Sequence, residues 1–230
     1  MKPRHYWNIA AKIGREVFEG RAVSNVDEQA GPAYFEGLAP SRWLFWKRLK
    51  LVFKEISTMR GTIAVDFGCG FGLAIPQLRE QFALTLGVDL VPELSKQFIH
   101  RWDETVGTHG HQVTIVKDLN EAGLAPGSVD LILALDVLEH FESPTDILSQ
   151  FHTLLSPSGV LVVSGPTENL LYRLGRKVVG FSGDYHHQDV YQVIDAMSRF
   201  FEVTVTHSFP FPIPLFLICS ATKKLQVALK

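Results

Sequence analysis

TIAVDFGCGFG, residues 62–72, decides how the rest of the chain is interpreted. An apolar run stops at Asp66, and glycine then occupies every second position, at Gly68, Gly70 and Gly72. A β-branched apolar run is typical of a buried strand, and the glycines after it indicate a tight turn. Glycine also lets a ligand approach the backbone without meeting a Cβ atom. The stretch therefore predicts a strand that ends at a ligand-binding loop.

Short apolar runs recur along the rest of the chain, separated by amphipathic stretches. Five of them are apolar at consecutive positions, as expected for parallel strands covered on both faces. They lie at 62–67, 84–90, 112–119, 129–136 and 160–166. The clearest helical pattern between them covers 143–159, with Ser143 as its cap and Pro144 in its first turn. This alternation predicts an α/β fold with right-handed crossovers.

The two ends of the chain depart from this alternation. The runs at 200–209 and 214–224 are joined by a short proline-rich turn, so they should pair antiparallel. The N-terminal part has no strand pattern. It predicts helices at about 6–19 and 41–57, joined by a connecting segment at 20–40.

Composition bounds the class of protein. With 230 residues, 46% of them hydrophobic, the chain is long enough for one sizeable domain with an appended cap. We expect an N-terminal helical cap over 1–60 and an α/β domain over 61–230. The formal net charge of −2 gives no reason to expect a nucleic acid partner.

Cysteine, histidine and hydropathy patterns indicate the expected metal content and cellular location. Two cysteines form no CxxC pair, and the nine histidines show no metal-ligand spacing, so no metal is expected. The N-terminus carries charges throughout and does not resemble a signal peptide. The longest apolar stretch, 209–221, contains three prolines, which argue against a membrane-spanning helix. These features favour a cytoplasmic protein, and leave peripheral membrane contact open.

The spacing of the glycines separates the candidate ligands. A dinucleotide fingerprint would need its third glycine at position 73, which is Leu73, and no G-K-[ST] phosphate loop is present. The D-x-G-x-G-x-G pattern, with Asp66 two residues before the first glycine, resembles the first motif of the class I S-adenosylmethionine-dependent methyltransferases. Within that family the chain is most similar to the small-molecule branch of methyltransferase types 11 and 12.

This resemblance implies a fold and a cofactor. The fold would be a Rossmann-like, seven-stranded, mostly parallel sheet with an antiparallel terminal hairpin, helices on both faces and an N-terminal helical cap. The cofactor would be S-adenosyl-L-methionine. Asp89, about 20 residues downstream of the glycines, would hold the ribose hydroxyls. The full set of cofactor-binding residues implied is Asp66, Gly68, Cys69, Gly70, Gly72, Asp89, Leu90, Asp118, Leu119, Leu135 and Asp136.

Two of these acids also have a simpler interpretation. Taken singly, Asp89 and Asp118 could be solvated acids at strand ends. Their joint placement at the ends of successive strands favours binding. Asp118 would accept from the adenine amino group, with Leu119 packed beside the ring. Cys69 is expected to be a small packing residue rather than a nucleophile.

Candidates for proton transfer are histidines. A nitrogen acceptor needs only to be unprotonated, whereas a hydroxyl usually needs a base. His140, four residues after Asp136, is the best candidate, and His186 is a weaker one in the loop after the fifth strand. Structural roles remain open for both.

The expected activity is methyl transfer to a small-molecule, lipid-like or glycan-linked acceptor, on oxygen, nitrogen or carbon. The fourth-strand motif, ALDVLEHF, lacks the N-P-P-Y pattern of nucleobase methyltransferases. Aromatic residues in the flanking segments suggest the lipid-like acceptor, although core packing would also explain them. A non-catalytic cofactor-binding protein for regulation or assembly is the alternative. A nucleotide-dependent oxidoreductase is disfavoured by the early third glycine.

The segments outside the sheet are candidates for closing the site. We expect residues 1–40 to lie over the cofactor cleft together with the insertion at 167–190, and to form the acceptor pocket. In the alternative, the N-terminal helices pack on a sheet face far from that edge.

Overall fold

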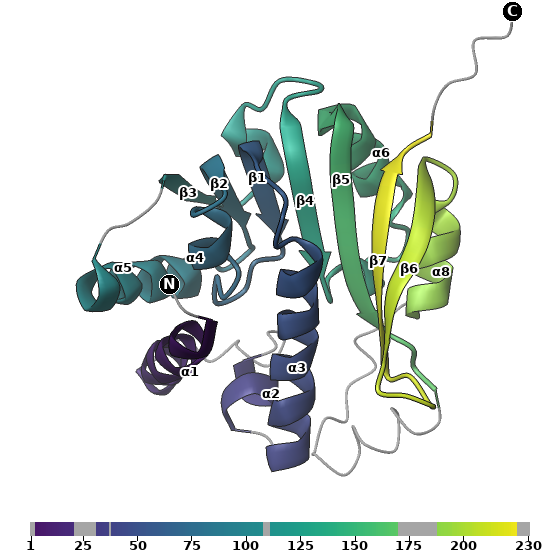
Figure 1. The fold of residues 1–230 in the computed structure, drawn as a ribbon. Coiled ribbons are helices and arrows are strands. Elements are labelled where there is room, and N and C mark those ends of the chain that lie inside the picture. Colours follow the sequence, from purple (N-terminus) through teal and green to yellow (C-terminus); the bar gives the residue numbers. More distant parts are fainter. Residues whose placement is uncertain (1–2, 21–30, 37, 108–110, 170–187, 225–230) are drawn as a thin grey trace, which may run out of the picture. The chain divides into compact units, whose positions relative to one another are not determined.

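The computed structural model describes residues 3–20, 31–36, 38–107, 111–169 and 188–224. The chain divides into two compact units, Met1–Gly123 and Leu124–Lys230. Figure 1 labels their helices and strands. The N-terminal helices belong to the same compact unit as the first three strands. The predicted domain boundary near residue 60 is a different division of the chain and stays a prediction.

Three parallel strands form the sheet of the first unit, in the order β3-β2-β1. They are β1 (Gly61–Phe67), β2 (Phe82–Val88) and β3 (Gln112–Val116). Phe67 pairs with Val88, and Val88 pairs with Val116. The three strands thus end together at one carboxyl edge, as the sequence predicts.

The described helices of the first unit are α1 (Pro3–Glu19), α2 (Gly31–Phe35), α3 (Ala39–Glu55), α4 (Ile75–Leu78), α5 (Pro92–Val106) and the 3-10 helix η2 (Leu119–Ala122). The two predicted N-terminal helices are confirmed within one turn at their ends. The short helix α2 lies in the segment that the sequence suggested to be only a connection.

Aromatic side chains attach the N-terminal helices to the unit. Tyr6 of α1 lies 5.4 Å from Phe53 of α3 and 5.0 Å from Trp102 of α5, measured between ring centroids. Trp7 lies 4.9 Å from Phe53. Such pairs contribute about 0.5–1.5 kcal/mol each beyond the burial of their area. The helices α1 and α3 are therefore packed into the unit through one shared aromatic core.

The second unit contains a parallel pair and an antiparallel hairpin, in the order β4-β5-β7-β6. The strands are β4 (Val129–Leu135), β5 (Leu155–Pro166), β6 (Phe201–Phe209) and β7 (Phe216–Lys223). β4 and β5 are parallel, whereas β7 is antiparallel to both β5 and β6. The predicted terminal hairpin is confirmed. All seven strands together make the seven-stranded, mostly parallel sheet that the sequence predicts.

The described helices of the second unit are η3 (Leu138–His140), α6 (Thr145–Leu154) and α8 (Val190–Met197). The predicted helix over 143–159 is too long at its C-terminal end, because β5 already begins at Leu155. Pro157 contributes to the difference, since a proline biases the preceding residue, here Ser156, toward extended backbone and so prevents the helix from continuing. The predicted cap is also wrong. Pro144 occupies the N-cap position, and the Ser143 hydroxyl bonds to Thr145 Oγ1 instead.

Candidate cofactor site

The glycine-rich loop turns sharply at the end of β1. The N–H groups of Gly68 and Cys69 both donate to the carbonyl oxygen of Val88, at 2.8 and 3.0 Å. Gly68, Gly70 and Gly72 have φ values of 71°, 53° and 74°. Residues with a Cβ atom rarely adopt this left-handed backbone. The conformation itself therefore accounts for a glycine at every second position.

Two of these glycines have surroundings that differ. A Cβ atom on Gly70 would meet no heavy atom within 4 Å, so this part of the loop faces open space. A Cβ atom on Gly72 would lie 3.1 Å from both Ile75 Cδ1 and Ser95 Cβ. Gly70 thus provides the open backbone that a ligand needs, whereas Gly72 lets the loop pack against α5.

A further glycine supports the loop from inside the sheet. Gly87 lies within β2, and a Cβ atom there would be 2.9 Å from Ile75 Cδ1 and 3.2 Å from Cys69 Sγ. Sequence reasoning did not single out this residue. The signal was available, because a glycine inside an apolar strand often marks a close approach of another backbone.

Asp89, directly after β2, lies against the glycine loop. Its Oδ2 atom accepts from the Gly70 N–H at 2.7 Å, and its Oδ1 atom accepts from the Val91 N–H at 2.9 Å. These charge-assisted bonds fix the carboxylate in place. An ionised carboxylate is an acceptor of the kind with which ligand hydroxyls pair.

A second carboxyl group lies beneath the loop at the end of β1. Asp66 is only 3% exposed. Burial, and to a lesser extent the charge of Asp89, raises the pKa of Asp66 to about 7. Burial likewise raises the pKa of the Cys69 thiol well above its usual value, with Asp66 and Asp89 contributing. A neutral buried thiol is a poor nucleophile, which agrees with the packing role expected of Cys69.

The other predicted residues of the first unit lie at the same carboxyl edge. Asp118 follows β3 and caps η2, where its Oδ1 atom accepts from the backbone N–H and the side-chain amide of Asn120 at 2.7 and 2.8 Å. Leu119 beside it is buried, whereas Leu90 beside Asp89 is 75% exposed. The edge therefore combines fixed acceptors with an exposed apolar side chain.

The N-terminal helices contact the glycine loop directly. The ring of Phe71 lies 6.0 Å from that of Phe18 in α1 and 5.4 Å from that of Phe35 in α2. The hydroxyl of Tyr6, also in α1, donates to the carbonyl oxygen of Leu73 at 2.6 Å. The sequence analysis expected residues 1–40 near the cofactor cleft but named none of these side chains. Only the amphipathic pattern of α1 indicated that its aromatic face would be covered.

The remaining predicted cofactor residues belong to the second unit. Leu135 ends β4, and Asp136 follows it with a φ of 53°. This left-handed backbone is uncommon for a residue other than glycine, and such outliers gather at functional sites. Ser164 of β5 donates its hydroxyl to Asp136 Oδ1 at 3.1 Å, and its carbonyl oxygen accepts the Asp136 N–H at 2.9 Å.

Of the two candidate bases, the structure describes only His140. His140 ends the one-turn helix η3 and is exposed. It lies in the loop that follows the carboxyl end of β4, as the sequence predicts. His186 lies outside the described residues, as do Tyr172 and Arg173 of the predicted insertion.

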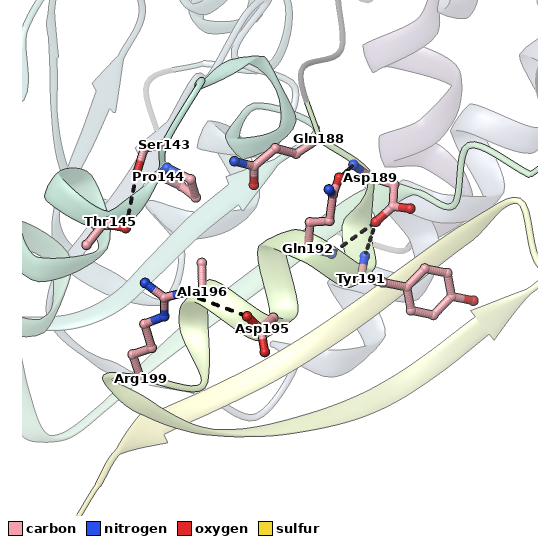
Figure 2. A pocket seen from close by; sticks show the side chains of 10 residues that line it. All are labelled: Ser143, Pro144, Thr145, Gln188, Asp189, Tyr191, Gln192, Asp195, Ala196 and Arg199. Atoms are coloured by element: carbon pink, nitrogen blue, oxygen red, sulfur yellow. Dashed lines mark hydrogen bonds and ion pairs between the residues drawn. The ribbon is translucent and has the colours of Figure 1, made fainter.

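A polar groove of about 620 Å³ opens beside this loop in the second unit. Figure 2 shows its walls, which come from the start of α6 and from α8. Asp189 caps α8 through the N–H groups of Tyr191 and Gln192, and Arg199 pairs with Asp195 at 3.9 Å. None of the predicted site residues lines this groove. Its charged groups serve helix caps and ion pairs, so we do not assign the cofactor to it.

Comparison with known proteins decides the family. Residues 65–163 match the profile of a methyltransferase domain. This match covers less than half of the chain and marks a methyltransferase domain within it. It is 35% identical over 107 residues to a ubiquinone biosynthesis O-methyltransferase of Xanthomonas euvesicatoria, covering 46% of this chain and 44% of that protein. It is 29% identical over 162 residues to the protein of the same name from Pseudomonas paraeruginosa, covering 64% and 66%. The chain thus spans about half to two thirds of these relatives.

Solved structures show the same fold. Magnesium protoporphyrin IX methyltransferase from Synechocystis PCC 6803, crystallised with bound S-adenosylhomocysteine, has a TM-score of 0.67 and 20% identity, with coverage of 93% of this chain and 99% of that one. The carbon methyltransferase CurJ has a TM-score of 0.62 and 16% identity, covering 96% and 69%. At this identity the likeness concerns the methyltransferase fold alone.

The residues present fit S-adenosylmethionine, the cofactor of this family. Gly70 presents open backbone to a ligand, and Asp89 presents a fixed carboxylate of the kind that ribose hydroxyls require. Leu90 adds an exposed apolar surface at the same edge. No cluster of three or more histidine, cysteine, aspartate or glutamate side chains suited to a metal ion occurs within the described ranges. Across those same ranges, no helix has the length and apolar character needed to span a membrane.

Proposed function

We propose that this methyltransferase domain transfers the methyl group of S-adenosylmethionine to a hydroxyl oxygen of a small, lipid-like acceptor. The carboxyl edge of the first unit carries the proposal, because Asp89 and the glycine loop there form a preorganised site for the nucleoside and its methionyl group. The choice of an oxygen and of a lipid-like acceptor rests on the two relatives, which are ubiquinone biosynthesis O-methyltransferases. Both cysteines are free thiols, which suits a reducing cytoplasm.

His140 is the residue that we propose as general base. When bound, the cofactor supplies a methyl group bonded to a sulfonium sulfur, and this sulfur is the leaving group. The chain has to orient the acceptor hydroxyl and to remove its proton. His140 is exposed and follows the left-handed Asp136 by four residues, so its imidazole can accept a proton from a substrate. His186 is retained only as a sequence-based candidate.

We further propose that residues 1–60 act as a cap for the 61–230 domain. The support lies within the first unit, where Phe18 and Phe35 pack on Phe71 of the glycine loop and Tyr6 bonds to Leu73. Because the cap is packed on the loop, a ligand bound to the loop can change the stability of the cap. The cap also helps to exclude water from the charged sulfonium.

A labelled-methyl transfer assay with a matched set of acceptors tests the proposed function. The set contains a dihydroxybenzene ring with a prenyl tail, the same ring without the tail, its fully O-methylated form, and a glycan-linked lipid. Label on the tailed phenol, a weaker signal on the tailless ring and none on the blocked ring is the expected result. Label on the glycan, or on the ring carbon of the blocked compound, would contradict the acceptor. Binding of S-adenosylhomocysteine without transfer to any acceptor would favour a non-catalytic cofactor-binding protein.

A further inference from the structure

The tip of the β6–β7 hairpin projects large apolar side chains into solvent. From Phe209 to Leu215 the chain reads FPFPIPL, without a charged residue. Phe211 is 93% exposed and Ile213 is 52% exposed. Large apolar side chains are normally buried, and two of them at one loop tip mark an interaction surface. Packing within the second unit does not account for either residue.

Hydrogen bonds hold the base of this tip. Three of its residues are prolines, which have no N–H group. The Leu215 N–H donates to Phe209 O at 2.9 Å, and Thr167 N–H donates to Leu215 O at 3.0 Å. Pro214 O accepts from Thr167 Oγ1 at 2.8 Å and from Asn169 Nδ2 at 2.7 Å. These bonds satisfy the backbone at the base of the tip, whereas residues 211–213 are exposed, so their backbone groups suit the hydrated headgroup level of a bilayer rather than its hydrocarbon core.

Residues 209–215 carry no charged side chain, and the acid that follows Thr167 in the adjoining segment is Glu168. The nearest acid and base along the hairpin are Glu202 and Lys223, which lie at its opposite end, where Phe201 pairs with Lys223. Between them the only ionisable side chains are half-buried His207 and buried Cys219. A polar partner surface would find few groups to pair with here. The boundary between lipid headgroups and acyl chains, where aromatic side chains gather, fits this chemistry better.

The tip lies at the functional edge of the second unit. Pro166, the last residue of β5, pairs with Phe216, the first residue of β7. The tip therefore extends beyond the carboxyl end of β5 (Figure 1). The neighbouring strand β4 ends at the same edge, at Leu135, and Asp136 follows it. A surface that held the tip would lie on the side of the unit where Asp136 and His140 are found.

We propose that residues 209–215 form a shallow membrane anchor, with Phe211 and Ile213 inserted at the level of the headgroups of a lipid bilayer. The contact is weak and reversible, because two apolar side chains provide only a small buried area. It does not depend on the charge of the lipid. It also goes beyond the proposed function, since binding requires neither cofactor nor methyl transfer.

Sedimentation of the full chain with vesicles tests the anchor. Wild-type protein should partition onto phosphatidylcholine vesicles, and equally onto vesicles that contain phosphatidylglycerol, from about 0.1 M to about 1 M salt. Phe211→Ser should lower the partition coefficient about 10- to 100-fold, the scale of one buried aromatic side chain. The control Tyr191→Ser, at an aromatic residue on α8 that is 53% exposed, should leave it unchanged.

A probe at the tip measures insertion directly. The variant Phe211→Cys can be labelled selectively with an environment-sensitive fluorophore, because Cys69 and Cys219 are buried. Addition of phosphatidylcholine vesicles should shift its emission to the blue, while the same label on Tyr191→Cys should not respond. Three results would each overturn the anchor: wild-type protein that stays in the supernatant, a Phe211→Ser variant that binds like wild type, or binding that occurs only on anionic vesicles and is lost in salt. Self-association that Phe211→Ser abolishes, without vesicle binding, would show a protein contact instead.

Discussion

The carboxyl edges of the two units differ in how their polar residues are held. In the first unit, Asp89 is fixed by two backbone N–H groups, and the glycine loop above it is packed against α5 and contacted by α1 and α2. In the second unit, Asp136 has a left-handed backbone, and His140 is exposed in a one-turn helix. A fixed edge suits a ligand of constant shape, and an exposed side chain can reach a second substrate. We therefore propose that the first edge binds the cofactor and that the second provides the acceptor chemistry.

The largest expected effect separates the chemistry of the second edge from binding at the first. His140→Gln should lower turnover by about 10²–10⁴-fold, because the acceptor hydroxyl loses its base. The affinity for S-adenosylhomocysteine should stay unchanged. Steady-state kinetics and calorimetry measure the two quantities.

The matched control for this variant is His111→Gln, which changes an exposed histidine before β3. It should leave turnover unchanged. A His140→Gln enzyme with near-normal turnover would mean that positioning alone drives methyl transfer. It would contradict the proposal that the second edge supplies a general base.

Burial of Asp66 should make stability depend on pH. The folded-state pKa of Asp66, about 7, lies above its ordinary value of 3.8, so the folded protein binds more protons than the unfolded chain between these limits. The free energy of unfolding should thus decrease as pH rises from about 4 to about 7, by on the order of 4 kcal/mol. Asp66→Asn should remove this slope. Denaturant unfolding of both proteins at several pH values is the measurement, and equal slopes would show that Asp66 is not the titrating group.

The sequence predicts the local features of the site better than its tertiary contacts. Strand ends and left-handed glycines are local features, so the positions of Asp66, Gly70 and Asp89 follow from the apolar pattern and the glycine spacing. The contacts of α1 with the loop depend on tertiary packing between segments far apart in sequence. No local pattern encodes them, which is why Tyr6 and Phe18 were missed. Asp118 was placed at the correct edge, but its role as cap of η2 was not foreseen.

A smaller effect is expected where the N-terminal helices touch the first edge. Phe71→Leu should lower the free energy of unfolding by about 1–2 kcal/mol, because it removes the ring contacts with Phe18 and Phe35. Phe211→Leu is the matched control and should be neutral, since Phe211 is 93% exposed. Thermal and denaturant unfolding compare the two variants. Equal destabilisation by both would contradict the packing of the helices on the loop.

The smallest effect concerns the proposed cap. Hydrogen exchange with and without S-adenosylhomocysteine should show added protection at 65–72, and a weaker gain in α2 at Gly31–Phe35, because Phe35 rests on Phe71. Protection confined to the loop and the strand ends would reduce the N-terminal helices to a structural support.

Calorimetric titration of Asp89→Asn tests most directly whether the first edge is the cofactor site. Wild-type protein should bind S-adenosylhomocysteine and should not bind NAD. The variant should bind about 2–3 kcal/mol more weakly, roughly 30- to 150-fold, as expected when hydrogen bonds to a charged acceptor are weakened. Asp146→Asn, at an exposed acid in the first turn of α6, is the control and should bind like wild type. A folded Asp89→Asn protein with wild-type affinity would contradict the account.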